Sequence, residues 1–295
     1  MLGLRDLDCL LALARYKHFA KAAEHCGLSQ PAFSMRIRNL EAQLDTQIVK
    51  RGNRFEGLTH DGEMILAHAR AIMQNVRALE EEVRAAHGDL SGALKVGVIP
   101  TAAPFVAHIA ARMNETYPGI TMTIESTSSL AIQQGVDDGR FDAGFTYTEG
   151  ASEDLLEVTP LYDERYVLMA PAALIKDHGN EISWAQAAAL PLILLDREMQ
   201  NRRIIDGVFD AQGVHPTVMA ESNGFISALA MSTEGMGATV IPEALFETLG
   251  DVGGCRGLSL TDPRVEKSVA LVTKQGDLAV PVVQALKRIA APPKQ

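Results

Sequence analysis

Apolar residues recur at spacings of three and four over the first 90 positions of this 295-residue chain, which is the period of amphipathic helices. One such run covers residues 4–16, and a second, rich in alanine, covers residues 19–26 and ends at Gly27. A third begins after Ser29, a residue type that favours the N-cap position, and ends near residue 44. A short helix, a turn containing glycine and a longer helix together predict a helix-turn-helix.

Residues 46–58 follow as two short extended pieces that meet at Gly52-Asn53, and we expect them to form a wing. Residues 59–87 then predict one long helix whose apolar positions alternate by four and three, like the a and d positions of a heptad. These dimer-helix positions are Ile65, Ala69, Ile72, Val76, Leu79 and Val83. The preceding segment is too short to cover the whole helix, so we expect pairing with a second chain. Packing within the same chain is the alternative.

From Leu94 the pattern changes to short apolar runs that alternate with amphipathic segments. This alternation predicts a mixed α/β fold with largely parallel sheets. The expected strands lie at 94–98, 120–125, 143–146, 167–170, 192–195, 218–221, 238–241 and 268–273. The expected helices lie near 104–116, 130–138, 202–212, 225–233 and 281–290.

Composition excludes several classes of protein. An apolar fraction of 47% and a charged fraction of 22% are ordinary for a globular protein and unlike a disordered or fibrous chain. The chain has no long uninterrupted apolar stretch and its first residues include acids, so we expect neither a membrane span nor a secretory signal. We therefore expect a cytoplasmic protein. The three cysteines have no metal-like spacing and indicate free thiols in a reducing compartment.

The net charge of −10 is unevenly distributed. Residues 1–90 hold 12 basic and 12 acidic side chains, whereas residues 91–295 hold 15 basic and 25 acidic ones. Residues 30–54 have a local charge of +3, which is compatible with a nucleic-acid-binding module despite the acidic whole.

Sequence motifs of common enzymes are absent. The chain has no His-Glu-x-x-His, no Cys-x-x-Cys, no Gly-x-Ser-x-Gly and no glycine-rich phosphate loop. We therefore expect no catalytic residues, no metal and no cofactor.

Residues 28–41, Leu-Ser-Gln-Pro-Ala-Phe-Ser-Met-Arg-Ile-Arg-Asn-Leu-Glu, resemble the recognition helix of LysR-type transcriptional regulators. Residues 19–23, residues 58–62 and the long helix extend the resemblance over essentially the whole chain. It implies a winged helix-turn-helix, a linker helix and a C-terminal two-lobed α/β effector-binding domain of the periplasmic-binding-protein type. It also implies a homodimer, often a homotetramer, that binds double-stranded promoter DNA and a small-molecule effector. The chain departs from the family pattern at three positions. Met35 stands where the family usually has arginine, Asp45 where it has glycine, and Val49 where it has an aromatic residue.

The N-terminal end of such a helix enters the major groove of DNA. There Gln30 can make a bidentate contact with adenine, while arginine can bind guanine or phosphate. Arginines on a wing suit a narrow minor groove. The candidate DNA-binding residues are Ser29, Gln30, Pro31, Ser34, Arg36, Arg38, Arg51 and Arg54. A solvated, capped surface helix is the alternative for each residue alone.

Ligands of two-lobed α/β domains lie at the carboxyl ends of strands, facing helix N-termini. Small hydroxyl and amide side chains stand at such positions here, and they suit a small anion or organic acid. The candidate effector-binding residues are Pro100, Thr101, Ser128, Ser129, Thr146, Gln200, Asn201 and Asn223. The family resemblance implies effector contacts at Thr101, Ser129, Thr146, Gln200 and Asn201. Ordinary helix capping is the alternative for each.

We expect three parts, namely a DNA-binding domain (1–58), a linker and dimerisation helix (59–88) and an effector-binding domain (92–295). Within the last, lobe I comprises about 92–162 and 268–295, and lobe II about 163–267. A ligand-responsive transcriptional regulator is the leading interpretation. The alternatives are a solute-binding protein and an enzyme domain fused to a DNA-binding module. The absence of a secretory signal and of catalytic motifs argues against them.

Overall fold

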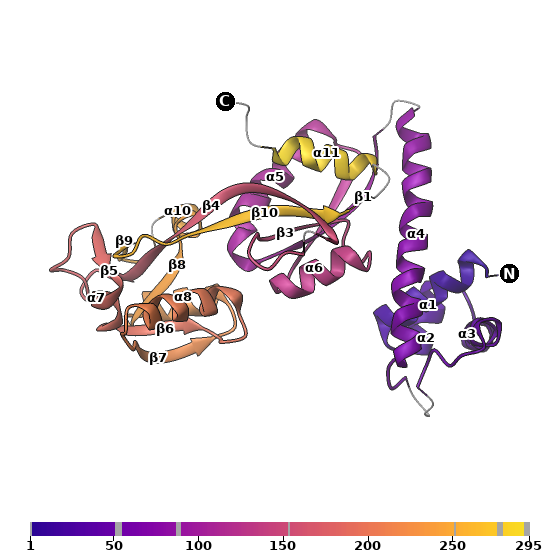
Figure 1. Cartoon of the computed structure of the whole chain (residues 1–295), viewed down its shortest axis with the longest axis horizontal. Helices are drawn as coiled ribbons and strands as arrows, with labels where there is room; N and C mark the ends of the chain where they lie inside the picture. Colours follow the sequence, from indigo (N-terminus) through magenta and orange to yellow (C-terminus); the bar gives the residue numbers. More distant parts are fainter. Residues whose placement is uncertain are drawn as a thin grey trace.

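The structure is a computed structural model, and it describes residues 2–50, 55–86, 90–152, 154–250, 252–275 and 280–291. A small helical domain at the N-terminus packs on one end of a long helix, and two α/β lobes extend away from that helix (Figure 1). This is the mixed architecture expected from the sequence.

Three helices build the N-terminal domain: α1 (Leu4–Tyr16), α2 (Phe19–His25) and α3 (Gln30–Leu44). Their apolar faces meet in two adjoining clusters, in which Leu10 and Phe33 have no exposed surface. The hydroxyl of Ser29 accepts a hydrogen bond from the backbone N–H of Ala32 and so caps α3 as expected. The helix ends at Asp45, whose φ of 48° is left-handed. Aspartate tolerates this conformation better than most residues, so the turn forms without glycine.

The wing begins after α3. Val49 and Leu58 form an antiparallel bridge, and the backbone N–H of Lys50 donates to the carbonyl oxygen of Gly57 at 3.1 Å. The two strand-like pieces therefore lie side by side. The expected turn at Gly52-Asn53 falls outside the described residues.

Helix α4 (His60–Ala86) connects the N-terminal domain to lobe I. At its start a Cβ on Gly62 would lie 2.2 Å from the carbonyl oxygen of Ile48, so only glycine allows the helix to approach the wing this closely. Farther along, Arg70 Nη1 lies 2.6 Å from Asp138 Oδ2 of lobe I. The helix therefore contacts both domains.

Lobe I is a sheet of parallel strands covered by helices on both faces (Figure 1). Its elements are β1 (Gly92–Val98), the 3-10 helix η1 (Pro100–Ala102), α5 (Ala103–Thr116), β2 (Ile120–Ser126), α6 (Ser129–Asp137), β3 (Ala143–Tyr147) and α11 (Pro281–Ala290). Every residue of β3 is buried, as expected for a strand with both faces covered.

Lobe II repeats this arrangement, with β6, β7 and β8 parallel to one another. Its elements are β5 (Glu181–Ser183), α7 (Trp184–Ala188), β6 (Pro191–Leu195), α8 (Gln200–Ala211), β7 (Thr217–Ser222), α9 (Phe225–Thr233), β8 (Ala238–Pro242), α10 (Glu243–Leu249) and β9 (Cys255–Thr261). Sequence patterning did not predict β5, α7, α10 and β9, and each has at most seven residues. With three and five residues, β5 and α7 contain too little of a repeat to be recognised.

Two long antiparallel strands, β4 (Leu156–Pro171) and β10 (Glu266–Lys274), join the lobes. Their register shifts between Val269 and Ala270, which marks a bulge. The strands run in the order β2-β1-β3-β10-β4-β8-β6-β7, so one continuous sheet passes through both lobes. Among the described residues, no helix is both long and apolar enough to cross a membrane.

Candidate functional site

The first turns of α3 present a polar surface to solvent. Ser29, Gln30, Pro31 and Arg38 are exposed, and Ser34 is half-buried. The opposite face of the helix is buried in the core of the domain through Phe33, Ile37 and Leu40. The exposed end of the capped helix is therefore free to enter a groove of DNA.

The two arginines of α3 have different environments. Arg36 Nη1 donates to Asp6 Oδ1 of α1 at 2.6 Å, so this guanidinium ties two helices of the domain together. Arg38 is exposed on the outer face. Arg36 therefore has a partner within the domain, although its side chain remains 35% exposed. The predicted DNA contacts of Arg36 and Arg38 stay predictions. Arg51 and Arg54 lie outside the described residues.

A cleft between the lobes gathers six of the eight predicted effector-binding residues. It is lined by Ile99, Pro100, Thr101, Thr127, Ser128, Ser129, Tyr147, Met199, Gln200, Asn201 and Phe225. Its volume is about 20 Å³, room for roughly one water-sized group. Among these residues none is Lys, Arg or Cys, so hydrogen-bonding groups without formal charge provide the polar lining.

Several polar atoms of the cleft are buried without a hydrogen-bond partner in the part of the chain that the structure describes. These atoms are Ser129 Oγ, Asn201 Nδ2 and Asn201 Oδ1. A buried polar group without a partner costs roughly 1–3 kcal/mol, so these atoms require a ligand or water. They come from both lobes, and α6 and α8 begin at Ser129 and Gln200 and direct their N-terminal N–H groups to the same place.

Other polar side chains near the cleft are already engaged. Ser128 accepts a hydrogen bond from the N–H of Ala131 and caps α6. Gln200 Oε1 accepts from Arg203 Nε at 3.1 Å and from Nη2 at 2.7 Å. Arg202 is only 2% exposed and donates to Leu195 O, Asp206 Oδ1 and Glu221 Oε1. Arg202 therefore holds lobe II together and brings no charge to the cleft.

Two predicted effector residues do not line the cleft. Thr146 is fully buried, and the cleft is lined by its neighbour Tyr147. Successive side chains of a strand point to opposite faces, so only one of the two can face the ligand. Asn223 is exposed to solvent, and Phe225, the first residue of α9, lines the cleft.

Behind the cleft lies a buried carboxyl group that sequence analysis missed. Glu164 of β4 is 3% exposed, and Tyr147 Oη donates to its Oε1 at 2.8 Å. Tyr147 Oη in turn lies 3.1 Å from Thr101 Oγ1, so the three side chains connect the cleft to β4. Burial raises the pKa of the Glu164 carboxyl.

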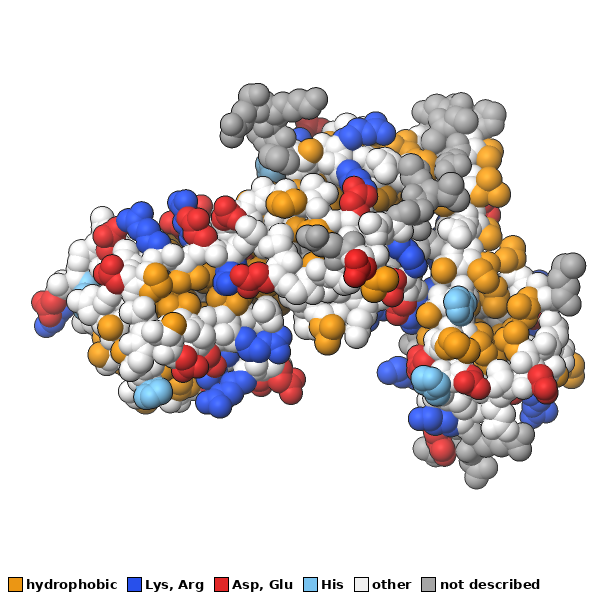
Figure 2. Space-filling view, in the orientation of Figure 1, with side chains coloured by type: hydrophobic (Ala, Val, Ile, Leu, Met, Phe, Trp, Pro, Cys, Tyr) orange, Lys and Arg blue, Asp and Glu red, His pale blue; other side chains and the backbone are white. Residues whose placement is uncertain are grey.

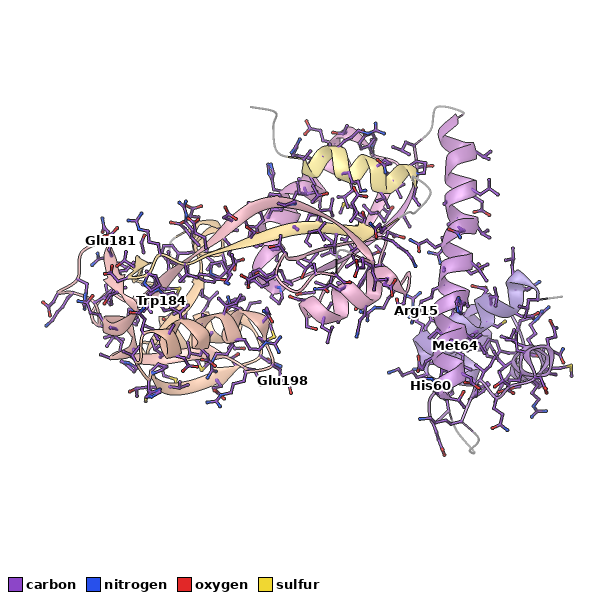
Figure 3. The ribbon with its side chains drawn as sticks, viewed as in Figure 1. Arg15, His60, Met64, Glu181, Trp184 and Glu198 are labelled. Atoms are coloured by element: carbon purple, nitrogen blue, oxygen red, sulfur yellow. The ribbon has the colours of Figure 1, made fainter. Side chains whose placement is uncertain are left out.

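Helix α4 carries an exposed apolar stripe. Figure 2 shows hydrophobic side chains gathered along α4 and the adjoining N-terminal domain, and Figure 3 places His60 and Met64 near the start of α4. Ile72, Leu79 and Val83 are 40%, 62% and 53% exposed. Ile65 and Val76 are half-buried. Ala69, which we expected in the seam between two chains, is 1% exposed and belongs instead to the core with α1.

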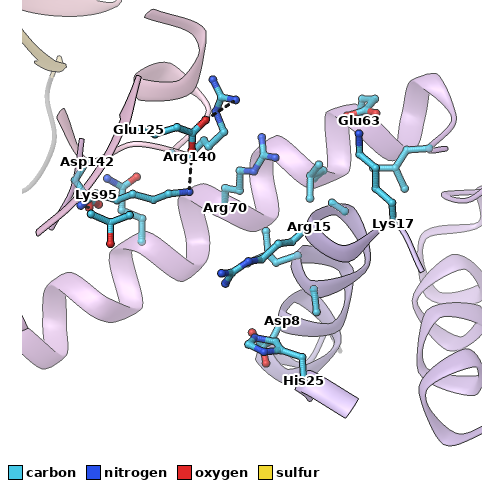
Figure 4. Close-up of a pocket in the computed structure, with 18 of the residues that line it drawn as sticks. Asp8, Arg15, Lys17, His25, Glu63, Arg70, Lys95, Glu125, Arg140 and Asp142 are labelled. Carbon is cyan, nitrogen blue, oxygen red and sulfur yellow. Dashed lines mark hydrogen bonds and ion pairs between the residues drawn. The ribbon is translucent and has the colours of Figure 1, made fainter. Parts of the chain in front are cut away.

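A second, larger pocket of about 1090 Å³ separates the N-terminal domain and α4 from lobe I (Figure 4). Its lining mixes both signs of charge. Glu125 lies 3.9 Å from both Lys95 and Arg140, and the ion pair of Arg70 with Asp138 spans one side. Of these contacts, the pair of Arg70 with Asp138 couples α4 to lobe I, and the others lie within lobe I.

The cysteines lie away from the effector cleft. Cys9 and Cys26 pack in the N-terminal domain, and Cys255 begins β9. Burial raises the pKa of the Cys9 thiol to about 12, which makes it a poor nucleophile. Within the described residues, no group of three or more His, Cys, Asp or Glu side chains could hold a metal ion.

Two family models match the chain. The model described as a bacterial regulatory helix-turn-helix protein of the lysR family matches residues 4–63. The model described as the LysR substrate binding domain matches residues 87–292.

Similar proteins extend over the whole chain. The hydrogen peroxide-inducible genes activator of Haemophilus influenzae is 26% identical and covers 98% of this chain and 95% of its own. The DNA-binding transcriptional dual regulator OxyR of Escherichia coli K12 is 27% identical and covers 93% and 90%.

Solved structures show the same fold. A full-length variant of OxyR from Pseudomonas aeruginosa has a TM-score of 0.79 and 24% identity, covering 98% of this chain and 95% of its own. Full-length CbnR complexed with its target DNA has a TM-score of 0.71 and 20% identity, covering 98% and 99%. The family models, which together match most of the sequence, agree with this fold, and the chain belongs to the LysR family of bacterial helix-turn-helix regulators.

Proposed function

We propose that this chain regulates transcription by binding promoter DNA as a dimer of DNA-binding domains, and that a small effector modulates this binding. Residues 1–58 bind DNA, residues 59–88 pair two chains, and residues 92–295 bind the effector. The observation that carries the proposal is the exposed, capped N-terminal end of α3, combined with a separate cleft that contains buried unpartnered polar groups. The DNA complex of CbnR, which has the same fold, supports it.

In the proposed DNA complex, the first turn of α3 enters the major groove. Gln30 reads a base edge, and Ser29, Ser34 and Arg38 bind bases or phosphates. Pro31 offers apolar surface to a thymine methyl group. Arg51 and Arg54 of the wing bind the minor groove or backbone. Arg36 supports the helix through Asp6.

Pairing of two chains supplies the geometry that paired half-sites require. The exposed apolar residues Ile72, Leu79 and Val83 lie on one side of α4, with Val76 between them. Burying this stripe against a second copy removes apolar surface from water. Ile65 extends the seam toward the DNA-binding domain. A homotetramer would pair two such dimers.

We propose a small anion or organic acid as the effector. Two helix N-termini and the hydroxyl and amide groups of Thr101, Ser129 and Asn201 can donate hydrogen bonds to it. The relatives named as hydrogen peroxide-inducible activators respond, by their names, to an oxidant. Here the chain has no cysteine between residues 27 and 254, so the cleft binds its effector without thiol chemistry.

The proposal is tested by a gel shift with the intergenic DNA upstream of the chain's own gene and a scrambled fragment of equal length. We expect selective retardation of the native fragment, and a footprint that changes with a small carboxylate from a panel. Equal retardation of both fragments would contradict specific DNA binding. An unchanged footprint with every carboxylate, despite specific binding, would contradict only the effector class.

A further inference from the structure

We propose that Glu164 controls which effectors the cleft accepts, because a small anion binds only while the Glu164 carboxyl carries a proton. This inference rests on the proposed role of the cleft as an anion site. It adds that Glu164, a residue of the connecting strand β4, sets whether the hydroxyl groups between it and the ligand can donate hydrogen bonds to an anion.

Two side chains connect Glu164 to the cleft. Thr101 and Tyr147 both line the cleft, and their oxygens are 3.1 Å apart. Tyr147 Oη lies 2.8 Å from Glu164 Oε1. Each hydroxyl has one proton to donate, so the direction of one hydrogen bond constrains the next.

An ionised Glu164 can only accept hydrogen bonds. Tyr147 then gives its single proton to Glu164, and Thr101 gives its own to Tyr147 or to the carboxylate itself. Thr101 is left with lone pairs facing the cleft. An anion would meet these lone pairs, with a buried negative charge behind them.

A protonated Glu164 allows the opposite direction. Its carboxyl proton goes to Tyr147 Oη, the proton of Tyr147 goes to Thr101 Oγ1, and the Thr101 hydroxyl is free to donate to the anion. An anion that selects this state raises the proton affinity of Glu164, and by linkage protonation of Glu164 raises the affinity for the anion by the same factor.

The surroundings of Glu164 favour the neutral form. Among the described residues no cation pairs with it, and the groups that interact with the carboxyl are the hydroxyls of Tyr147, which donates to Oε1, and of Tyr166 and Thr101. Its register partner on β10, Lys267, binds Glu149 at 2.6 Å, and its neighbour Arg165 pairs with Glu266 at 2.8 Å. These two cations are therefore engaged elsewhere.

The remaining titratable groups near Glu164 are tyrosines. Burial, followed by the charge of Glu164, raises the pKa of Tyr147 on β3 and of Tyr162 and Tyr166 on β4. All three hydroxyls therefore stay protonated over the range in which Glu164 titrates. A pH dependence of ligand binding in that range reports on the carboxyl.

Formate is a suitable probe because it is small and stays anionic above pH 5. Calorimetric titration of the full-length dimer from pH 5 to pH 10 should give a dissociation constant that does not vary on the acid side of the Glu164 pKa. Above the pKa of Glu164 the constant should rise tenfold per pH unit. Glu164→Gln should remove this slope, because an amide can donate to Tyr147 at every pH. Ser129→Ala is the matched control. It should weaken formate binding by the same factor at all pH values and leave the pH dependence of the dissociation constant unchanged.

A flat profile in the parent protein would overturn the proposal while leaving the anion site intact. Failure of formate to bind at any pH would overturn the anion site itself, and this inference with it. A slope that persists in Glu164→Gln would assign the titration to another group and also overturn the proposal. If Glu164→Gln does not fold, Tyr147→Phe replaces it. Removal of the middle hydroxyl should reduce the slope to the part that the buried charge alone causes, and an unchanged slope would overturn the proposal.

Discussion

The substitution Ile72→Asp tests whether the stripe on α4 joins two chains. Ile72 lies in the middle of the stripe and is 40% exposed in the single chain. Full burial of an isoleucine contributes about 1.5–3 kcal/mol, so the exposed part contributes about 0.6–1.2 kcal/mol per chain. Two chains lose twice this amount, and two desolvated carboxylates add a penalty of several kcal/mol. We expect a total loss of about 3–5 kcal/mol, or roughly a hundred- to several-thousand-fold weaker dimer.

Sedimentation equilibrium over a wide concentration range measures this loss, and a gel shift with paired half-sites should weaken in parallel. The matched control is Ile226→Asp on α9, where the same change falls on a side chain that is 84% exposed. The control should leave pairing through α4 unchanged. An unaltered dimer in Ile72→Asp, with only a lower melting temperature, would refute the reasoning and show that the stripe packs within its own chain.

Three further substitutions test the DNA interface and the cleft. Gln30→Ala should cost about 1–3 kcal/mol on the specific site and little on random DNA, as measured by competition gel shifts, and equal losses on both would contradict a base contact. Arg38→Ala should weaken both kinds of binding evenly and lower the salt slope by roughly one, whereas an unchanged slope would remove Arg38 from the phosphate contacts. Thr101→Ala should weaken formate binding by about 1–3 kcal/mol in calorimetry and leave effector-free footprints intact. Loss of DNA binding without ligand would instead show that Thr101 is structural.

The helical N-terminal domain was accessible from sequence because its signals are local. Ser29 caps α3, and the apolar spacing of Phe33, Ile37 and Leu40 defines the buried face of that helix. Capping and periodicity act within one or two turns, so neither requires knowledge of the partner surface. The ion pair of Arg36 could not be predicted, for the opposite reason. Its partner Asp6 lies 30 positions away and is brought close only by packing of α1 on α3.

The long helix shows the limit of periodicity. The heptad spacing predicted both the helix and a stripe that includes Ile72 and Leu79, and these residues are exposed in the single chain. The same spacing placed Ala69 in the stripe, although it packs against α1. When one face of a helix packs within the chain and a neighbouring face is exposed, the apolar positions of both faces appear as a single periodic pattern in the sequence. Only the position of α1 decides which residues are covered within the chain.

Sequence alone was enough for the N-terminal helices, most of the strands, the cap of α3 and the strand ends that carry polar side chains, because each depends on neighbours within a few residues. Tertiary structure decided which of those side chains share a cleft. It turned Tyr147 rather than Thr146 toward the cleft, since the face of a strand depends on the sheet around it. It also linked Glu164 to Thr101 through the hydroxyl of Tyr147, which depends on where β4 crosses between the lobes. Burial at this place raises the pKa of the Glu164 carboxyl, and burial is a property of the assembled lobes.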